Sequence, residues 1–184
     1  MARRVSKVSA GVLMAGSALL VSPPSMAAEP RPQLVDAAEA PDPIAPGASG
    51  TAVVGLRNVG HVDARNDGQM YMELWAPRYS YFTAPTLTPV GDAPGGWSCK
   101  GDAAVEGRPY KSTILKCSSD KKGVVAAARE AVRWKVQMSV SPQAPADTVL
   151  HNAGEDGYGA VLYHSTNGRG TWSNMSLQIY TQDA

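Results

Sequence analysis

The sequence predicts an all-β protein, either a sandwich or a barrel, and three features carry that prediction. Apolar and polar residues alternate without a break over residues 132–140, which is typical of a half-buried strand. Shorter stretches of the same kind recur between turn signals, and no segment has a convincing amphipathic helical pattern. Cys99, Cys117 and Trp97 lie among these strand-like segments, as expected for a cross-linked β-sheet core.

The first 27 residues have the pattern of a secretory signal peptide. Basic residues at positions 3, 4 and 7 precede an apolar run, and Ser25-Met26-Ala27 ends the segment with a small-x-small pattern. The apolar run is about a dozen residues long, whereas a membrane-spanning helix needs ~20. We therefore expect cleavage after Ala27 or Ala28, and a secreted or cell-envelope-associated protein without a membrane span.

Charge and cysteine content narrow the possible functions. The predicted mature chain keeps 14 of the 17 basic residues and all 16 acidic ones, so its net charge is near −2. That balance does not favour binding to nucleic acid or to anionic lipid. In an exported chain an even pair of cysteines favours a disulfide over a metal site or a nucleophile. We therefore expect a bond between Cys99 and Cys117.

The elements before the cysteines follow in order. Residues 28–49 form a proline- and alanine-rich lead-in that we expect to be flexible or extended, with an edge strand near residues 33–37. The β domain is then expected over residues 50–184. Strands are expected over residues 51–57 and 70–75, joined by a polar loop. Prolines break residues 79–90, so at most one short edge strand is expected there.

The second half of the chain continues the strand pattern. Residues 110–117 alternate and predict a strand, and the alanine-rich residues 124–131 are expected to be a loop leading into the strand at 132–140. A hairpin is expected at the end, between residues 159–165 and 171–181. The Asn-Gly pair between them supplies the positive φ angles of tight hairpin turns.

Several short motifs follow one another along roughly residues 50–153: Asn58-x-Gly60, Asp63-Ala64, Pro77, Gly96-Trp97-x-Cys99, Cys117 and Asn152-Ala153. Their order resembles that of a known family, the immunoglobulin-like conserved repeat domain of bacterial surface and secreted proteins. The resemblance implies an immunoglobulin-like antiparallel β-sandwich of seven strands with bonded cysteines, and a role as spacer, stalk or adhesion module without catalytic residues. The C-terminal hairpin lies outside this pattern, as an addition to the sandwich or as a strand replacement.

Aromatic residues are concentrated between positions 71 and 82, which hold five of the twelve in the chain: Tyr71, Trp75, Tyr79, Tyr81 and Phe82. Aromatic side chains on the outward parity of a strand form a platform for sugar rings or for a protein partner. We predict these five as binding residues. Uncovered patches of this kind are uncommon in monomers, so we favour the alternative that the terminal hairpin covers Tyr71 and Trp75 as a second layer.

Four residues of metal-ligating type lie close together in the sequence: His151, Glu155, Asp156 and His164. Zinc or calcium would accept such side chains, but the spacing matches no established metal motif. Solvated loop charges are the favoured interpretation, and we expect no metal and no cofactor.

Three functional hypotheses follow. The first is a secreted, non-enzymatic module that binds protein or cell-envelope material. The second is a secreted metal-dependent hydrolase with a site near His151 and His164. The third is a small secreted protease inhibitor whose loop, Val90 to Gly96, is presented by the disulfide.

Overall fold

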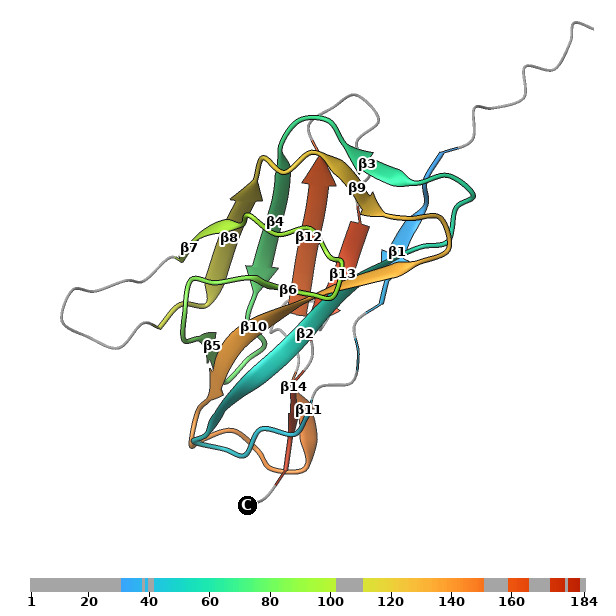
Figure 1. The fold of residues 1–184 in the computed structure, drawn as a ribbon. Coiled ribbons are helices and arrows are strands. Elements are labelled where there is room, and N and C mark those ends of the chain that lie inside the picture. Colours follow the sequence, from blue (N-terminus) through green and yellow to red (C-terminus); the bar gives the residue numbers. More distant parts are fainter. Residues whose placement is uncertain are drawn as a thin grey trace, which may run out of the picture.

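The computed structural model describes residues 31–37, 39, 42–101, 111–150, 159–165, 173–177 and 179–182. All regular secondary structure in these residues is β-strand, which confirms the all-β prediction. Two larger antiparallel sheets lie face to face as a sandwich (Figure 1). The predicted signal peptide lies outside the described residues. In the described part of the chain, no helix is long and apolar enough to cross a membrane.

The first sheet is built on two ten-residue strands, β2 and β10, which pair antiparallel from Ala131 opposite Arg57 to Ser139 opposite Ser49. The predicted edge strand pairs with the outer side of β2, and two short strands pair with the other side of β10. The strands are β1 (Leu34–Asp36), β2 (Ser49–Asn58), β10 (Ala131–Val140), β5 (Ser80–Phe82) and β6 (Thr88–Val90).

The second sheet combines three strands from the middle of the chain with two strands from its C-terminal part. Two small two-stranded sheets complete the described structure. Its order is β13 (Ser173–Leu177), β12 (Gly159–Ser165), β4 (Met70–Trp75), β8 (Ile114–Ser119) and β7 (Ser98–Gly101). The small sheets are β3 (Ala64–Asn66) with β9 (Gly123–Ala126), and β11 (Thr148–Leu150) with β14 (Ile179–Thr181).

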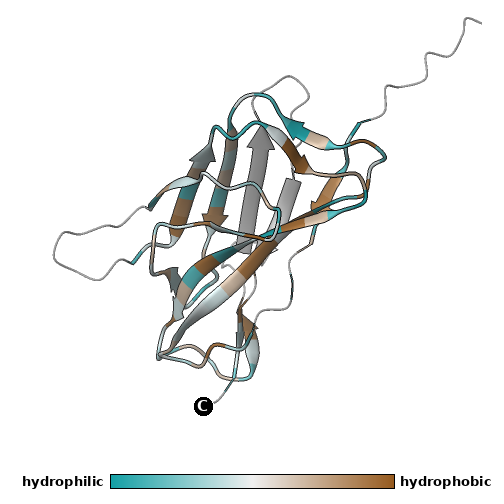
Figure 2. Cartoon of the chain, in the orientation of Figure 1, coloured by the Kyte–Doolittle hydropathy of each residue, from teal (hydrophilic) through white to brown (hydrophobic). Residues whose placement is uncertain are grey.

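The core lies between the two larger sheets, because β2, β4, β8 and β10 turn their apolar parity inward. Hydrophobic and hydrophilic residues are interleaved along these strands in Figure 2. Full burial of a large apolar side chain contributes about 1.5–3 kcal/mol relative to exposure. The alternation predicted for β4 and β10 is confirmed: Met70, Met72, Leu74, Trp134, Val136, Met138 and Val140 are buried, and Val132 of the same parity is partly buried.

Two tryptophans connect the sheets at the core. Trp134 of β10 is fully buried, and the half-buried Trp97, just before β7, packs against it edge to face with ring centroids 6.0 Å apart. Both indole N–H groups donate to the carbonyl oxygen of Pro94, at 2.8 Å from Trp97 and 2.9 Å from Trp134. Sharing this acceptor satisfies both buried polar groups, which would otherwise be costly.

The predicted disulfide between Cys99 and Cys117 is present. The two residues are direct partners on neighbouring antiparallel strands, β7 and β8, and their Cα atoms are 4.0 Å apart. The bond therefore ties an edge strand to the next strand of the same sheet. Both cysteines belong to the core packing, Cys117 as a buried residue and Cys99 as a partly buried one.

Three expectations about individual segments need correction. Residues 124–126, expected to be part of a loop, belong to β9, because β3 supplies a pairing partner that the local sequence does not show. Residues 79–90 contain two short strands rather than one, β5 and β6, both paired with β10. The lead-in has a second anchor: Ile44 is buried, and its N–H donates to the carbonyl of Tyr180 in β14 at 2.9 Å.

Asn58, at the end of β2, is fully buried and fully hydrogen-bonded. Its Oδ1 accepts from the backbone N–H groups of Gln33 and Gly60, at 3.2 and 3.0 Å. Its Nδ2 donates to the carbonyl oxygens of Val62 and Ala126, at 2.8 and 3.1 Å. One side chain thus joins the lead-in, the loop after β2 and strand β9. This gives the Asn58-x-Gly60 motif a structural role.

A candidate ligand-binding face

The most functional-looking surface is the outward face of the second sheet, over β4, β8 and β7. The register places its outward residues in rows across the three strands, because direct partners in a sheet lie on the same face. The first row is Tyr71, Ser118 and Ser98, the second is Glu73, Lys116 and Lys100, and Trp75 lies opposite Ile114 in the third. We call this surface the β4–β8–β7 face.

The described strands of the terminal hairpin lie beside this face and not over it. Strand β12 pairs edge to edge with β4, from Val161 opposite Leu74 to Ser165 opposite Met70. The hairpin therefore widens the sheet instead of forming a layer over it, and the favoured alternative for Tyr71 and Trp75 is wrong. Pairing between strands so distant in the chain is not visible in local sequence patterns.

Tyr71 and Trp75 occupy the outward positions that the parity of β4 predicts. Tyr71 is 36% exposed, and Trp75 is half-buried. The hydroxyl of Tyr71 donates to Oε1 of Gln69, which restricts the orientation of the ring. Both residues therefore present aromatic surface on the β4–β8–β7 face.

Tyr79 and Tyr81 lie beyond the end of β4, and a cation of this chain lies over each ring. The guanidinium carbon of Arg78 is 4.9 Å from the ring centroid of Tyr79, and Nζ of Lys111 is 4.4 Å from that of Tyr81. Such contacts are favourable, and they occupy one face of each ring. The binding role predicted for these two tyrosines stays a prediction.

Phe82 is the exception among the five aromatic residues, because its side chain is fully buried. The expectation that it belongs to a surface platform is wrong. Its N–H donates to the carbonyl of Ser112 at 2.8 Å, and Met138 of β10 is its direct partner. Phe82 thus lies where β5 connects the two sheets. The sequence around it is too irregular for its parity to indicate burial.

The second row of the face holds three charged side chains. Lys116 forms an ion pair with Glu73 on β4, with Nζ 3.2 Å from Oε1. On its other side Lys116 is the direct partner of Lys100 on β7. Among the described residues, no acidic side chain forms an ion pair with Lys100. The row therefore carries two positive charges and one negative charge.

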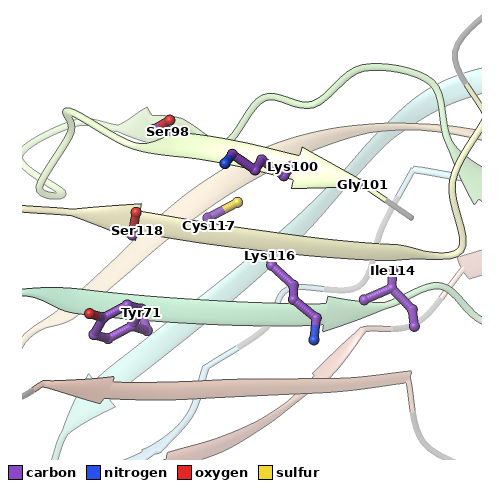
Figure 3. A pocket seen from close by; sticks show the side chains of 8 residues that line it. All are labelled: Tyr71, Ser98, Lys100, Gly101, Ile114, Lys116, Cys117 and Ser118. Atoms are coloured by element: carbon purple, nitrogen blue, oxygen red, sulfur yellow. The ribbon is translucent and has the colours of Figure 1, made fainter. Parts of the chain in front are cut away.

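A shallow hollow of about 550 Å³ lies on this face. Figure 3 shows Lys116 extending from β8 across β4, and the Lys100 side chain running along β7 with its amine toward the end that carries Ser98 and Ser118. The sequence prediction did not include the lysines and serines of this hollow. They alternate with Cys99 and Cys117 along the two strands, so the sequence already indicated that they lie on the opposite face of the sheet from the cysteines. The lining residues are Tyr71, Ser98, Lys100, Gly101, Ile114, Lys116, Cys117 and Ser118.

The metal-site hypothesis falls mainly on residues that the structure does not describe. His151, Glu155 and Asp156 lie outside the described residues. His164 lies in β12, where its backbone is the direct partner of Tyr71. Within the described ranges, no group of three or more His, Cys, Asp or Glu side chains is placed to hold a metal ion.

The loop proposed for protease inhibition is anchored in the protein at its centre, by two buried residues. Ala93 and Pro94 are buried, and the Pro94 carbonyl accepts the two indole hydrogen bonds. The carbonyl of the next residue, Gly95, accepts a hydrogen bond from the hydroxyl of Ser119 at 2.8 Å. The exposed residues of the loop are Val90, Gly91, Asp92 and Gly96. The protease-inhibitor hypothesis stays a prediction.

Comparison with protein-family models found no match for this chain. Comparison with curated proteins found none either.

Proposed function

We propose that the protein is a secreted, non-enzymatic, immunoglobulin-like module that binds protein or cell-envelope material through the β4–β8–β7 face. The observation that carries this proposal is the outward placement of Tyr71 and Trp75 on a sheet that the described strands of the terminal hairpin extend sideways. Exposed aromatic side chains on a rigid strand lose little conformational entropy on binding, and they are frequent at the centres of binding sites.

Two further features support a binding role. The face combines aromatic rings with hydroxyl and amine groups around a hollow, and this combination of apolar surface with a few polar groups is usual for ligand sites. Its residues come from three neighbouring strands, one of which is cross-linked to the next by the disulfide. Side chains on hydrogen-bonded strands are held more rigidly than side chains on a loop. This rigidity favours a role in ligand binding over a role in conformational change.

Sedimentation of the purified exported protein with envelope fractions of the producing cell tests the proposal. Truncation of an aromatic residue at the centre of a binding site commonly costs at least about 2 kcal/mol. We therefore expect the double variant Tyr71→Ala, Trp75→Ala to bind at least about thirtyfold more weakly than the unmodified protein.

Tyr180→Ala is the matched control. Tyr180 has the same exposed fraction as Tyr71, 36%, but lies on β14 in a separate small sheet. The control should bind like the unmodified protein. Equal binding by the double variant and the control would overturn the proposal that the β4–β8–β7 face is the binding surface.

A further inference from the structure

We propose that the ligand of the β4–β8–β7 face is an acidic glycan. A carboxylate or phosphate group of the glycan would be held by Lys100 with Ser98 and Ser118, and a sugar ring would lie against Tyr71. This inference rests on the proposed function and names the ligand class of the same site.

The first argument is that, among the described residues, Glu73 is the one acidic side chain that forms an ion pair with a lysine of the second row. Lys100 and Lys116 are direct partners across β7 and β8, and like charges directly opposite each other destabilise a sheet. The carboxylate of Glu73 lies on the far side of Lys116, 3.2 Å from its Nζ. An anion bound beside Lys100 would offset the repulsion that Glu73 leaves in place.

The second argument is the convergence of donors at one end of the hollow. Figure 3 shows the amine of Lys100 directed along β7 toward the end where Ser98 and Ser118 lie, and these two serines are direct partners. An ammonium group offers three N–H donors, and each hydroxyl offers one more. Hydrogen bonds from a charged donor to a carboxylate or phosphate are about twice as strong as neutral ones.

The third argument is the position of Tyr71 in the same row. It is the direct partner of Ser118 on the side away from Ser98. Neighbouring strands lie about 4.8 Å apart, so the row from Tyr71 to Ser98 spans roughly 10 Å. A sugar ring on the tyrosine can therefore extend a charged substituent to the donors on β7.

The composition of the hollow distinguishes a glycan from a protein partner. Two serines and two lysines are among its lining residues. Lysine and serine are depleted at the centres of protein interfaces, where aromatic, methionine and arginine side chains are enriched. A polar ligand with many hydroxyl groups and one anionic group uses such a lining better than an apolar protein surface does.

Isothermal titration of the exported protein with two acidic probes tests the inference: an oligogalacturonate, which carries carboxylates, and an oligosaccharide of phosphorylated mannose. A neutral mannose oligosaccharide is the reference ligand. We expect at least one acidic probe to bind at least about tenfold more tightly than the neutral one, with an affinity that falls as salt is added. The stronger of the two acidic probes identifies the anionic group.

Lys100→Ala should weaken binding of the acidic probe about tenfold, the usual effect of losing one charged hydrogen bond. Lys135→Ala is the matched control, because Lys135 is also an exposed mid-strand lysine but lies on β10 in the other sheet. The control should bind like the unmodified protein.

Two outcomes would overturn the inference: equal affinity for acidic and neutral probes, or unchanged binding by Lys100→Ala. Either result would leave the proposed function standing if Tyr71→Ala, Trp75→Ala still abolished binding to envelope fractions. If the double variant Tyr71→Ala, Trp75→Ala bound envelope fractions as tightly as the unmodified protein, the proposed function itself would be overturned. The two failures are therefore distinguishable.

Discussion

Replacement of Asn58 by alanine tests how far one buried amide holds separate parts of the fold together. The change removes four hydrogen bonds, two accepted from N–H groups and two donated to carbonyl oxygens. The four backbone groups that remain belong to Gln33, Gly60, Val62 and Ala126. They lie at the junction of the lead-in with β2 and β9, where water has limited access because Asn58 is fully buried.

The expected loss of stability follows from these four bonds. A hydrogen bond contributes a net 0.5–1.5 kcal/mol, and an unsatisfied buried partner costs about 1–3 kcal/mol. We expect Asn58→Ala to lower the free energy of unfolding by about 4 kcal/mol. This is a large part of the roughly 5–15 kcal/mol that holds a typical domain folded.

Urea unfolding followed by tryptophan fluorescence measures this loss, because Trp134 is fully buried in the folded protein. With a typical dependence of about 2 kcal/mol per molar urea, the midpoint should fall by about 2 M. Gln137→Ala is the control: its amide makes one exposed hydrogen bond, to the hydroxyl of Thr51 at 3.2 Å. Removing that bond should change stability by less than about 0.5 kcal/mol.

A second variant, Asn58→Asp, separates hydrogen bonding from side-chain volume. An ionised aspartate keeps the shape and can still accept from Gln33 and Gly60, but it cannot donate to the carbonyls of Val62 and Ala126. Because its charge would lie buried beside two carbonyl oxygens, we expect it to be at least as destabilising as alanine. If Asn58→Ala cost no more than Gln137→Ala, or if Asn58→Asp were as stable as the unmodified protein, the reasoning would be refuted.

The remaining predictions concern the disulfide and the metal hypothesis. Replacing Cys99 and Cys117 by serine should lower stability by about 3 kcal/mol, measured by thermal unfolding, because the bond closes a loop between residues 18 positions apart. Mass spectrometry of the exported protein should find no free thiol, and two free thiols would contradict the structure. Elemental analysis should find no stoichiometric zinc or calcium, and His151→Ala should leave the melting temperature unchanged. A bound metal that this variant loses would instead support the hydrolase hypothesis.

The strands with strict alternation were predictable from the sequence, because burial of one parity leaves a local pattern. Val132 to Val140 and Met70 to Leu74 show this pattern, and the structure buries the expected parity in each. Strand β9 was missed because it has only four residues, and its partner β3 lies far away in the sequence. Local propensity does not record a partner of that kind.

The candidate site was predictable only in part, because a site depends on which strands are neighbours. Parity placed Tyr71 and Trp75 outward, and the even pair of cysteines predicted the disulfide. The position of the terminal hairpin beside β4 and the alignment of Lys100 with Lys116 are set by sheet order and register. A one-residue change in register would move every side chain of a strand to the other face, and sequence alone does not fix that register.

Several edge strands of the two larger sheets are short, which affects how another chain could pair with them. An exposed strand edge presents unpaired backbone groups that another chain can extend into an aggregate. Here β1, β5 and β6 have three residues each, Pro89 lies within β6, and the four-residue β7 is covalently tied to β8. These four edges offer few consecutive groups for strand addition, whereas the other edge of the second sheet is the five-residue β13. Edge-to-edge pairing with another chain is therefore disfavoured at β1, β5, β6 and β7.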